Sequence, residues 1–292
     1  VRNLSNKKVL CCMCGAFSDK WLDVSKRCGK NADALSVEWG QHIDPMLLDE
    51  KLSSGEYDLV TLVHNETSCG MMNPLEEIMS VLAKYPDVLS VIDTVSSFSV
   101  VPIPKDQWAI DVILTGSQKA LALPPGLALF SVSERAFNRA KSIEGRGYYF
   151  DFIEFLKNHE KGMTPSTPVI PLFHGLLYTL EKIFEEGVTN RQQRHDNLNQ
   201  MVHNWVFNHG FELLPEKQFA SKSLTCVKNT LNIDVAGFVK ALREEKKLSI
   251  DGGYGKIKGK TFRISNMGNE STESIEHLLS EMDGVLPRFL DK

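Results

Sequence analysis

Two residues that could do chemistry together stand just after short apolar runs in the first half of the chain. Asp93 ends the run that begins at Val88, and Lys119 lies a few residues beyond the run Asp111–Thr115. In open α/β sheets, ligands bind beyond the carboxyl ends of the strands. We therefore expect both side chains to face a common ligand there.

The chemistry that this pair suits is that of pyridoxal phosphate. A lysine amine condenses with the cofactor's aldehyde. A carboxylate keeps the pyridine nitrogen protonated, so that the ring can accept electrons from the substrate. A plain ion pair between Asp93 and Lys119 would explain the same spacing, and the residues alone leave both readings open. His64, which also ends an apolar run, is expected to be a structural hydrogen-bonding histidine.

The elements that must position these groups follow an alternating pattern of strands and helices. This pattern indicates an α/β fold with a mainly parallel sheet, and the short apolar strands indicate helices on both faces. Asp44-Pro45 and Asn73-Pro74 predict two helix starts with a capping side chain. The expected strands are Lys8–Met13, Ala34–Glu38, Asp58–His64, Val88–Asp93, Asp111–Thr115 and Ala128–Val132.

The pattern changes after Gly162. A loop rich in Pro and Thr precedes a long helical stretch, Pro171–His209, which Gly187 could divide. The rest predicts a smaller α+β unit with a helix from Asp234 to Glu245, a strand at Thr261–Ser265 and a final helix. We therefore expect a large domain at 1–190 and a small C-terminal domain at 191–292.

Composition excludes several classes of function. The 292 residues carry a net charge of -4, which gives no general attraction to nucleic acid. Transmembrane segments of 18 or more apolar residues are absent from the sequence, and no signal peptide is seen. The six cysteines include the cluster Cys11-Cys12-x-Cys14, but no second ligand pair follows it, so we expect no metal. Reduced, buried thiols favour a cytoplasmic location.

Several separated motifs resemble one family. Val91–Ser97 and Thr115–Leu127 are similar to the core signature of class V aminotransferases, specifically the alanine–glyoxylate and serine–pyruvate aminotransferase group. The resemblance covers nearly the whole chain, because further motifs occur in the family's order. These are Gly15–Phe17, His64–Gly70, Thr164–Pro168 and Phe262–Gly268.

The resemblance implies a fold-type I enzyme that is a homodimer and binds pyridoxal 5'-phosphate. Lys119 corresponds to the lysine that forms the Schiff base and moves the substrate proton, and Asp93 to the acid at the pyridine nitrogen. Val95 would pack on one face of the ring and Phe17 would stack on the other. For Phe17, a simple core aromatic is the alternative.

The remaining roles that the resemblance implies concern the cofactor's oxygens and the substrate. Thr67 would contact the phenolic oxygen and Gln118 the phosphate, which Thr167 of the partner subunit would also contact. Arg263 would bind the substrate carboxylate with its planar fork. Ordinary turn hydroxyls are the alternative for Thr67 and Thr167, and a surface arginine is the alternative for Arg263.

The implied reaction transfers an amino group from a small amino acid, of the alanine or serine type, to a 2-oxo acid such as glyoxylate or pyruvate. It proceeds by ping-pong kinetics. The family places a Gly-rich turn before the segment that matches Lys8–Met13. That turn is absent here, so we expect the N-terminal part of the large domain to be missing. Thr164 also stands where some relatives have a tyrosine.

Three other readings follow from the same residues. A product without the Gly-rich turn could be a catalytically impaired scaffold. Cysteine desulfurases share the fold, but they place a His where Gln118 stands, and Cys226 lacks the loop setting of their nucleophile. The turn Gly252–Gly255 precedes a strand and does not open a helix, so it does not indicate a nucleotide site.

Overall fold

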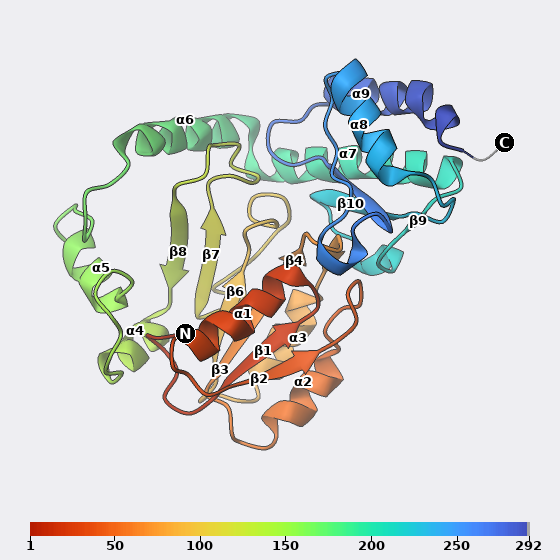
Figure 1. The fold of residues 1–292 in the computed structure, drawn as a ribbon. Coiled ribbons are helices and arrows are strands. Elements are labelled where there is room, and N and C mark those ends of the chain that lie inside the picture. Colours follow the sequence, from red (N-terminus) through yellow and green to blue (C-terminus); the bar gives the residue numbers. More distant parts are fainter. Residues whose placement is uncertain (291–292) are drawn as a thin grey trace.

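The computed structural model describes residues 1–290, and its largest feature is a six-stranded sheet (Figure 1). The strand order is β2-β1-β3-β6-β7-β8, and all neighbours are parallel except β7 and β8. The predicted α/β fold with a mainly parallel sheet is therefore confirmed. The strands are β1 (Val9–Met13), β2 (Ala32–Ser36), β3 (Leu59–Val63), β6 (Leu89–Asp93), β7 (Val112–Gly116) and β8 (Ala128–Val132).

Helices cover both faces of the first half of this sheet. Val9 and Cys11 of β1 pack into the cluster on the side of α1, while Leu10 and Cys12 pack into the cluster on the side of α2 and α3. This alternation follows from the two-residue period of a strand. The helices concerned are α1 (Ala16–Arg27), α2 (Pro45–Leu52) and α3 (Leu75–Leu82).

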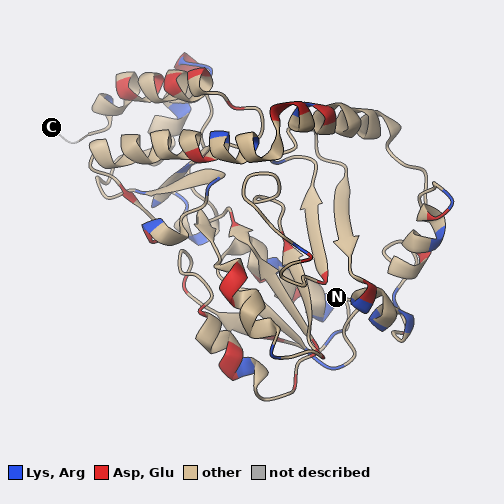
Figure 2. Cartoon of the chain, turned by 180° about the vertical axis from the view of Figure 1, so that it is seen from behind, with Lys and Arg blue, Asp and Glu red and all other residues tan. Residues whose placement is uncertain are grey.

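The second half of the sheet is covered less completely. Every residue of β8 is partly or fully exposed, and Figure 2 shows that β7 and β8 carry no charged residue. Figure 1 shows α6 lying across the ends of these two strands. Helix α6 spans Ile170–Glu186, and two shorter helices, α4 (Glu134–Lys141) and α5 (Phe152–His159), precede it in the chain.

A break at Gly187 separates α6 from α7 (Val188–Asn208). Gly187 has φ 85°, a conformation that favours glycine, so the predicted division of the long helical stretch is confirmed. Helix α7 then packs through Leu198 and Val202 into the core of the C-terminal unit. These contacts agree with a division near residue 190, which we retain as a proposal.

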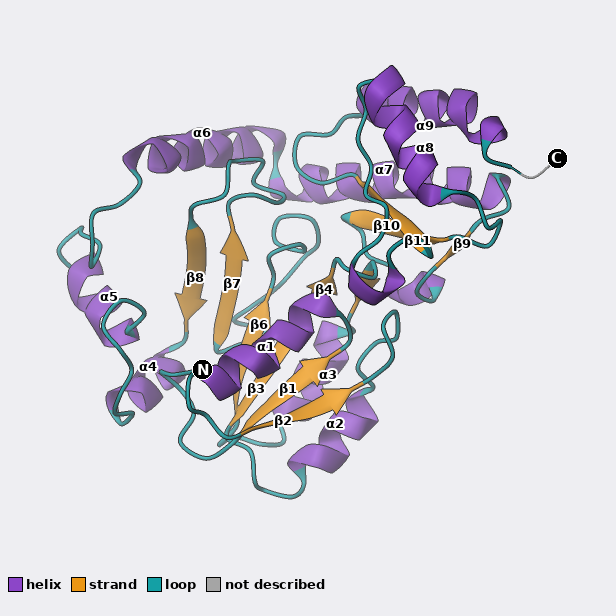
Figure 3. Ribbon diagram, viewed as in Figure 1, coloured by secondary structure: helices purple, strands orange, loops and turns teal. Residues whose placement is uncertain are grey.

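The C-terminal unit is a small antiparallel sheet with helices on one side (Figure 3). Its strand order is β11-β10-β9, so β11 lies at an edge. The expected helix after Asp234 and the expected strand at 261–265 are both confirmed. The elements are β9 (Glu212–Leu213), β10 (Leu224–Lys228), α8 (Val235–Glu245), β11 (Thr261–Ser265) and α9 (Thr272–Val285).

The two predicted caps of the large domain differ in outcome. The Asp44 side chain accepts a hydrogen bond from the Met46 N–H at 2.8 Å and caps α2 as expected. The prediction for Asn73 is wrong, because α3 has no side-chain cap. Asn73 is buried, and its side chain bonds the Ile43 N–H and the Val63 carbonyl instead. Long-range partners therefore outweighed the local cap.

Candidate active site

Asp93 is the last residue of β6 and has two hydrogen-bond donors. The Val95 N–H donates to Oδ1 at 3.0 Å, and the indole Nε1–H of Trp21 on α1 donates to Oδ2 at 3.3 Å. Burial raises the pKa of the Asp93 carboxyl, while the two donors act in the opposite direction. Because each oxygen accepts one hydrogen bond, the carboxylate is held in a single orientation and keeps further lone pairs for a ligand.

Lys119 lies in the connection between β7 and β8, and hydrogen bonds within this connection hold it in place. The Ser117 hydroxyl donates to the Pro124 carbonyl at 2.7 Å and accepts the Leu127 N–H at 3.2 Å. The Lys119 Nζ lies 6.0 Å from the centroid of the Phe17 ring. Burial lowers the pKa of the Lys119 amine, and the charge of Arg263 lowers it further. A larger fraction of neutral amine is therefore present near pH 7 than for a solvated lysine.

Phe17 is placed by a buried carboxylate at the start of α1. Glu66 accepts the backbone N–H groups of Phe17 at 3.1 Å and Ser18 at 2.8 Å, and the Ser68 hydroxyl at 2.6 Å. A Cβ at Gly15 would lie 2.3 Å from the Glu66 Cγ, so only glycine fits there. Glu66 thus ties the loop that carries Thr67 to the helix that carries Phe17.

Arg263 joins the small unit to the large one. Its Nη1 donates to the Thr67 carbonyl at 2.7 Å, and its Nε donates to Asp251 at 2.9 Å. The guanidinium also lies 5.4 Å from the centroid of the Tyr254 ring, which in turn is 5.5 Å from Phe17. Strand β11 therefore brings its arginine to the edge of the large sheet.

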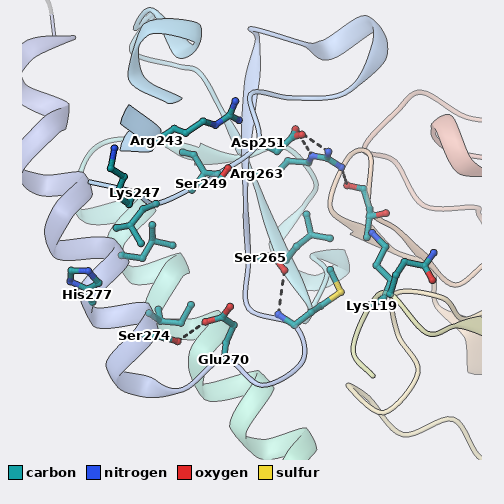
Figure 4. Close-up of a pocket in the computed structure, with 18 residues that line it drawn as sticks. Lys119, Arg243, Lys247, Ser249, Asp251, Arg263, Ser265, Glu270, Ser274 and His277 are labelled. Carbon is teal, nitrogen blue, oxygen red and sulfur yellow. Dashed lines mark hydrogen bonds and ion pairs between the residues drawn. The ribbon is translucent and has the colours of Figure 1, made fainter. Parts of the chain in front are cut away.

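One cavity of about 740 Å³ contains four of the predicted residues (Figure 4). Thr67, Gln118, Lys119 and Arg263 line it, with Lys119 on the side of the large domain. Asp93 does not line this cavity, but its charge acts on Lys119. It partly offsets the lowering of the Lys119 pKa by burial and by Arg263. The amine, the guanidinium and the carboxylate thus form one electrostatic group.

Two predicted residues differ in their position relative to this group. Val95 is partly buried in the turn after β6, beside Asp93. Thr167 is exposed and lines a separate cavity of about 550 Å³, together with Trp21 and Phe130. The chain therefore does not bring Thr167 to Lys119 by itself, in keeping with the expectation that a partner subunit would receive it.

His64 differs in part from its prediction. It is buried, and burial lowers the pKa of its imidazole to about 4, so the ring is neutral near pH 7. Its Nδ1 has no hydrogen-bond partner within the described part of the chain. The expected structural histidine is present, but the expected hydrogen bond is wrong for that nitrogen.

Three residues of this site had no predicted role. Trp21 stands four positions after Phe17, so the helical period already put both on one face of α1. Glu66 lies inside a recognised motif, but no sequence rule relates it to the amides of α1. Asp251 lies next to the glycine pair 252–253, and only the pairing of two chain segments brings it to Arg263.

The residues present fit pyridoxal phosphate. An oriented carboxylate, Asp93, and an amine of lowered pKa, Lys119, act on one another across the space beside the Phe17 ring. This donor set is what a pyridine nitrogen and an aldehyde require. Residues 1–290 hold no group of three His, Cys, Asp or Glu side chains that could together bind a metal ion.

Comparison with known proteins identifies the family. The chain belongs to the class-V aminotransferases, because the family model matches residues 7–277. It is 37% identical over 266 residues to an uncharacterised aminotransferase of Methanocaldococcus jannaschii, covering 89% of this chain and 68% of that protein. It is 33% identical to the serine–glyoxylate aminotransferase of Arabidopsis thaliana, covering 96% of this chain and 71% of the relative.

Solved structures agree with this assignment. The alanine–glyoxylate aminotransferase of Nostoc sp. superposes with a TM-score of 0.89 at 28% identity, covering 96% of this chain and 75% of that one. The chain is thus an aminotransferase of fold type I, and pyridoxal phosphate is its cofactor. A cysteine desulfurase of Thermococcus onnurineus is 16% identical with a TM-score of 0.75, which shows a shared fold alone.

The desulfurase alternative also lacks its nucleophile in the structure. Cys226 is buried in the middle of β10, and burial raises the pKa of its thiol to about 12. A reactive cysteine needs access and an available thiolate, so Cys226 is a structural residue. Separately, none of the helices within residues 1–290 combines the length and apolar character that crossing a bilayer requires.

Proposed function

We propose that this aminotransferase moves the amino group of a small amino acid, of the alanine or serine type, to glyoxylate or pyruvate. The relatives named above include serine– and alanine–glyoxylate aminotransferases, which supports this substrate class. The observation that carries the proposal is the pair of an amine, Lys119, and a guanidinium, Arg263, in one cavity. Both half-reactions would use the same cavity in turn, which gives ping-pong kinetics.

The proposed roles follow from the groups that each residue presents. Bound pyridoxal phosphate supplies an aldehyde and an electron-accepting ring. Lys119 would hold it and carry the proton between the substrate α-carbon and the cofactor C4′ carbon, which its lowered pKa favours at neutral pH. Asp93 would keep the pyridine nitrogen protonated. Arg263 would bind the substrate carboxylate and so aim its α-hydrogen at Lys119.

Five further residues would shape the cofactor site. Phe17 and Val95 would enclose the ring, since Phe17 already lies beside Lys119. Thr67 and Gln118, which line the cavity, would contact the phenolic oxygen and the phosphate. Thr167 would reach the phosphate of the other subunit.

The decisive experiment follows cofactor uptake. The purified chain should turn yellow with pyridoxal phosphate, and borohydride should fix the cofactor on Lys119 as shown by peptide mass. Lys119→Ala should lose both the fixed cofactor and turnover of alanine or serine with glyoxylate, while its circular dichroism stays unchanged. A colourless wild-type protein, or one that takes up cofactor without any turnover, would favour the impaired scaffold.

We also propose that the enzyme is a homodimer. Apolar side chains are exposed along α6, where Leu177, Tyr178 and Phe184 are 57%, 62% and 70% accessible. Exposed apolar surfaces of this kind commonly mark interaction sites, and exposed Thr167 lies in the same part of the chain. Sedimentation analysis should give twice the mass of the chain, and a monomer at all concentrations would contradict the proposal.

We propose a cytoplasmic location for the enzyme. All six cysteines are free thiols, five of them buried, which suits a reducing compartment. The balanced charge of the chain supports small molecules as its ligands and argues against nucleic acid as a partner.

A further inference from the structure

Arg263 is held by acceptors before any substrate arrives. Its Nε and Nη2 both lie 2.9 Å from Oδ1 of Asp251, and its Nη1 lies 2.7 Å from the Thr67 carbonyl. A guanidinium has five N–H groups. Within residues 1–290, two of the five donate a hydrogen bond, and Nη2 adds an ion-pair contact with Asp251. N–H groups on both terminal nitrogens therefore remain for a ligand.

Asp251 is itself fixed by the backbone. It forms an antiparallel bridge with Arg263, in which the Arg263 N–H donates to the Asp251 carbonyl at 2.7 Å and the Asp251 N–H donates back at 3.1 Å. The Gly253 N–H also donates to Oδ1 of Asp251 at 2.9 Å. Gly253 has φ 90°, and a Cβ there would lie 2.7 Å from the Thr261 carbonyl oxygen. The turn that presents Asp251 therefore requires glycine at position 253.

We propose that Asp251 is the positioning residue of the substrate-carboxylate site. It holds one edge of the Arg263 guanidinium while the Thr67 carbonyl holds a second point. The remaining N–H groups of the two terminal nitrogens are thereby presented in a fixed direction to the carboxylate of the amino acid or oxo acid. This inference rests on the proposed function of Arg263. Figure 4 shows the contact between Asp251 and Arg263.

The fixed direction matters because a free arginine side chain has many conformations. A planar guanidinium binds a carboxylate well only when two N–H groups meet its two oxygens together. The Arg263 side chain is 15% exposed, whereas that of Asp251 is 49% exposed. The ion pair is thus open to water on the Asp251 side, so its importance lies in direction more than in stability.

The acceptor and the charge of Asp251 can be separated by two substitutions. Asp251→Ala removes both, whereas Asp251→Asn keeps an oxygen that can accept the same hydrogen bonds. We expect Asp251→Ala to raise the apparent KM for the amino donor about tenfold with kcat changed much less, which corresponds to loss of a carboxylate contact. We expect Asp251→Asn to keep KM within about threefold of the wild type.

Glu245 provides a matched control in the same small unit. It pairs with both terminal nitrogens of Arg288 at 3.0 Å, and its side chain is also 49% exposed. Glu245→Ala should leave KM unchanged. An unchanged KM in Asp251→Ala, or an equal rise of KM in Asp251→Asn and Asp251→Ala, would overturn the positioning role. If Asp251→Ala and Glu245→Ala lowered Tm equally and neither changed KM, the contact between Asp251 and Arg263 would be a purely structural ion pair.

Binding of glyoxylate to the full chain separates this inference from the proposed function. Ligand-observed NMR should show weaker glyoxylate binding in Asp251→Ala than in the wild type or Asp251→Asn. If the wild type transaminates but Asp251→Ala binds glyoxylate normally, only the inference fails. If the wild type shows no transamination, the proposed function fails, and the same titration still supports or overturns the role of Asp251.

Discussion

Lys119 and Arg263 line one cavity, but the protein controls them by different means. Lys119 and its electrostatic partner Asp93 stand at the ends of buried strands, and burial is the largest cause of the pKa shift of each. Arg263 lies on the edge strand β11, beside a half-exposed Asp251. The side with Lys119 and Asp93 therefore controls the protonation of its groups, and the side with Arg263 and Asp251 controls the direction of the guanidinium. We call them the protonation side and the docking side.

This comparison predicts that substitutions on the protonation side lower kcat more than those on the docking side. The largest effect is expected for Asp93→Asn, which keeps the shape but cannot carry the negative charge. We expect kcat to fall about 10²- to 10⁴-fold, the range for groups that manage protons in a reaction. Steady-state kinetics with alanine and glyoxylate measures this. Activity within a few fold of the wild type would contradict the proposed difference between the protonation side and the docking side.

Arg263→Ala should have a smaller effect of a different kind. Loss of the charged hydrogen bonds to the substrate carboxylate should cost about 2–3 kcal/mol in kcat/KM, mainly as a raised KM. Cofactor uptake, followed by visible absorbance, should remain normal. If KM and kcat/KM were unaltered, the carboxylate would have to bind elsewhere and the docking side would be wrongly assigned.

Trp21→Phe should have the smallest effect, because it removes one N–H donor and keeps an aromatic ring. The donor lowers the pKa of Asp93, so its loss should move the acid limb of the pH profile of kcat to higher pH. The fall in kcat at neutral pH should be about two- to tenfold, which corresponds to the net free energy of one typical hydrogen bond.

Trp205→Phe is the control for this experiment. Trp205 also donates its Nε1–H to an aspartate, Asp283, but it lies in the small unit. Trp205→Phe should leave the pH profile of kcat unchanged. A shift of equal size in both variants would mean that loss of packing, and not the contact with Asp93, moves the profile.

Much of the fold could be predicted from the sequence because local signals and final packing agree. All six expected strands of the large sheet are present within two residues of their expected bounds, since each is an apolar run between polar turns. Asp44 caps its helix as a local rule predicts. Asn73 does not, because it lies close enough to two other backbone segments to bond with them.

The site was predictable to the extent that it lies in continuous motifs. Lys119, Thr67 and Arg263 line one cavity, although their roles are still proposals. The contact of Trp21 with Asp93 spans 72 positions in the chain, and that of Arg263 with Thr67 spans 196. Periodicity and spacing describe neighbours on one element, so they give no information on such pairs.

The carboxylate of Glu66 at the start of α1 has a further consequence for the cofactor. The first amides of a helix are a favourable place for a dianion, yet here an internal acid already occupies them. We therefore expect the phosphate donors elsewhere, which agrees with the contacts that we propose for Gln118 and for Thr167 of the other subunit. Helix α1 instead positions two aromatic rings, Phe17 beside Lys119 and Trp21 in contact with Asp93.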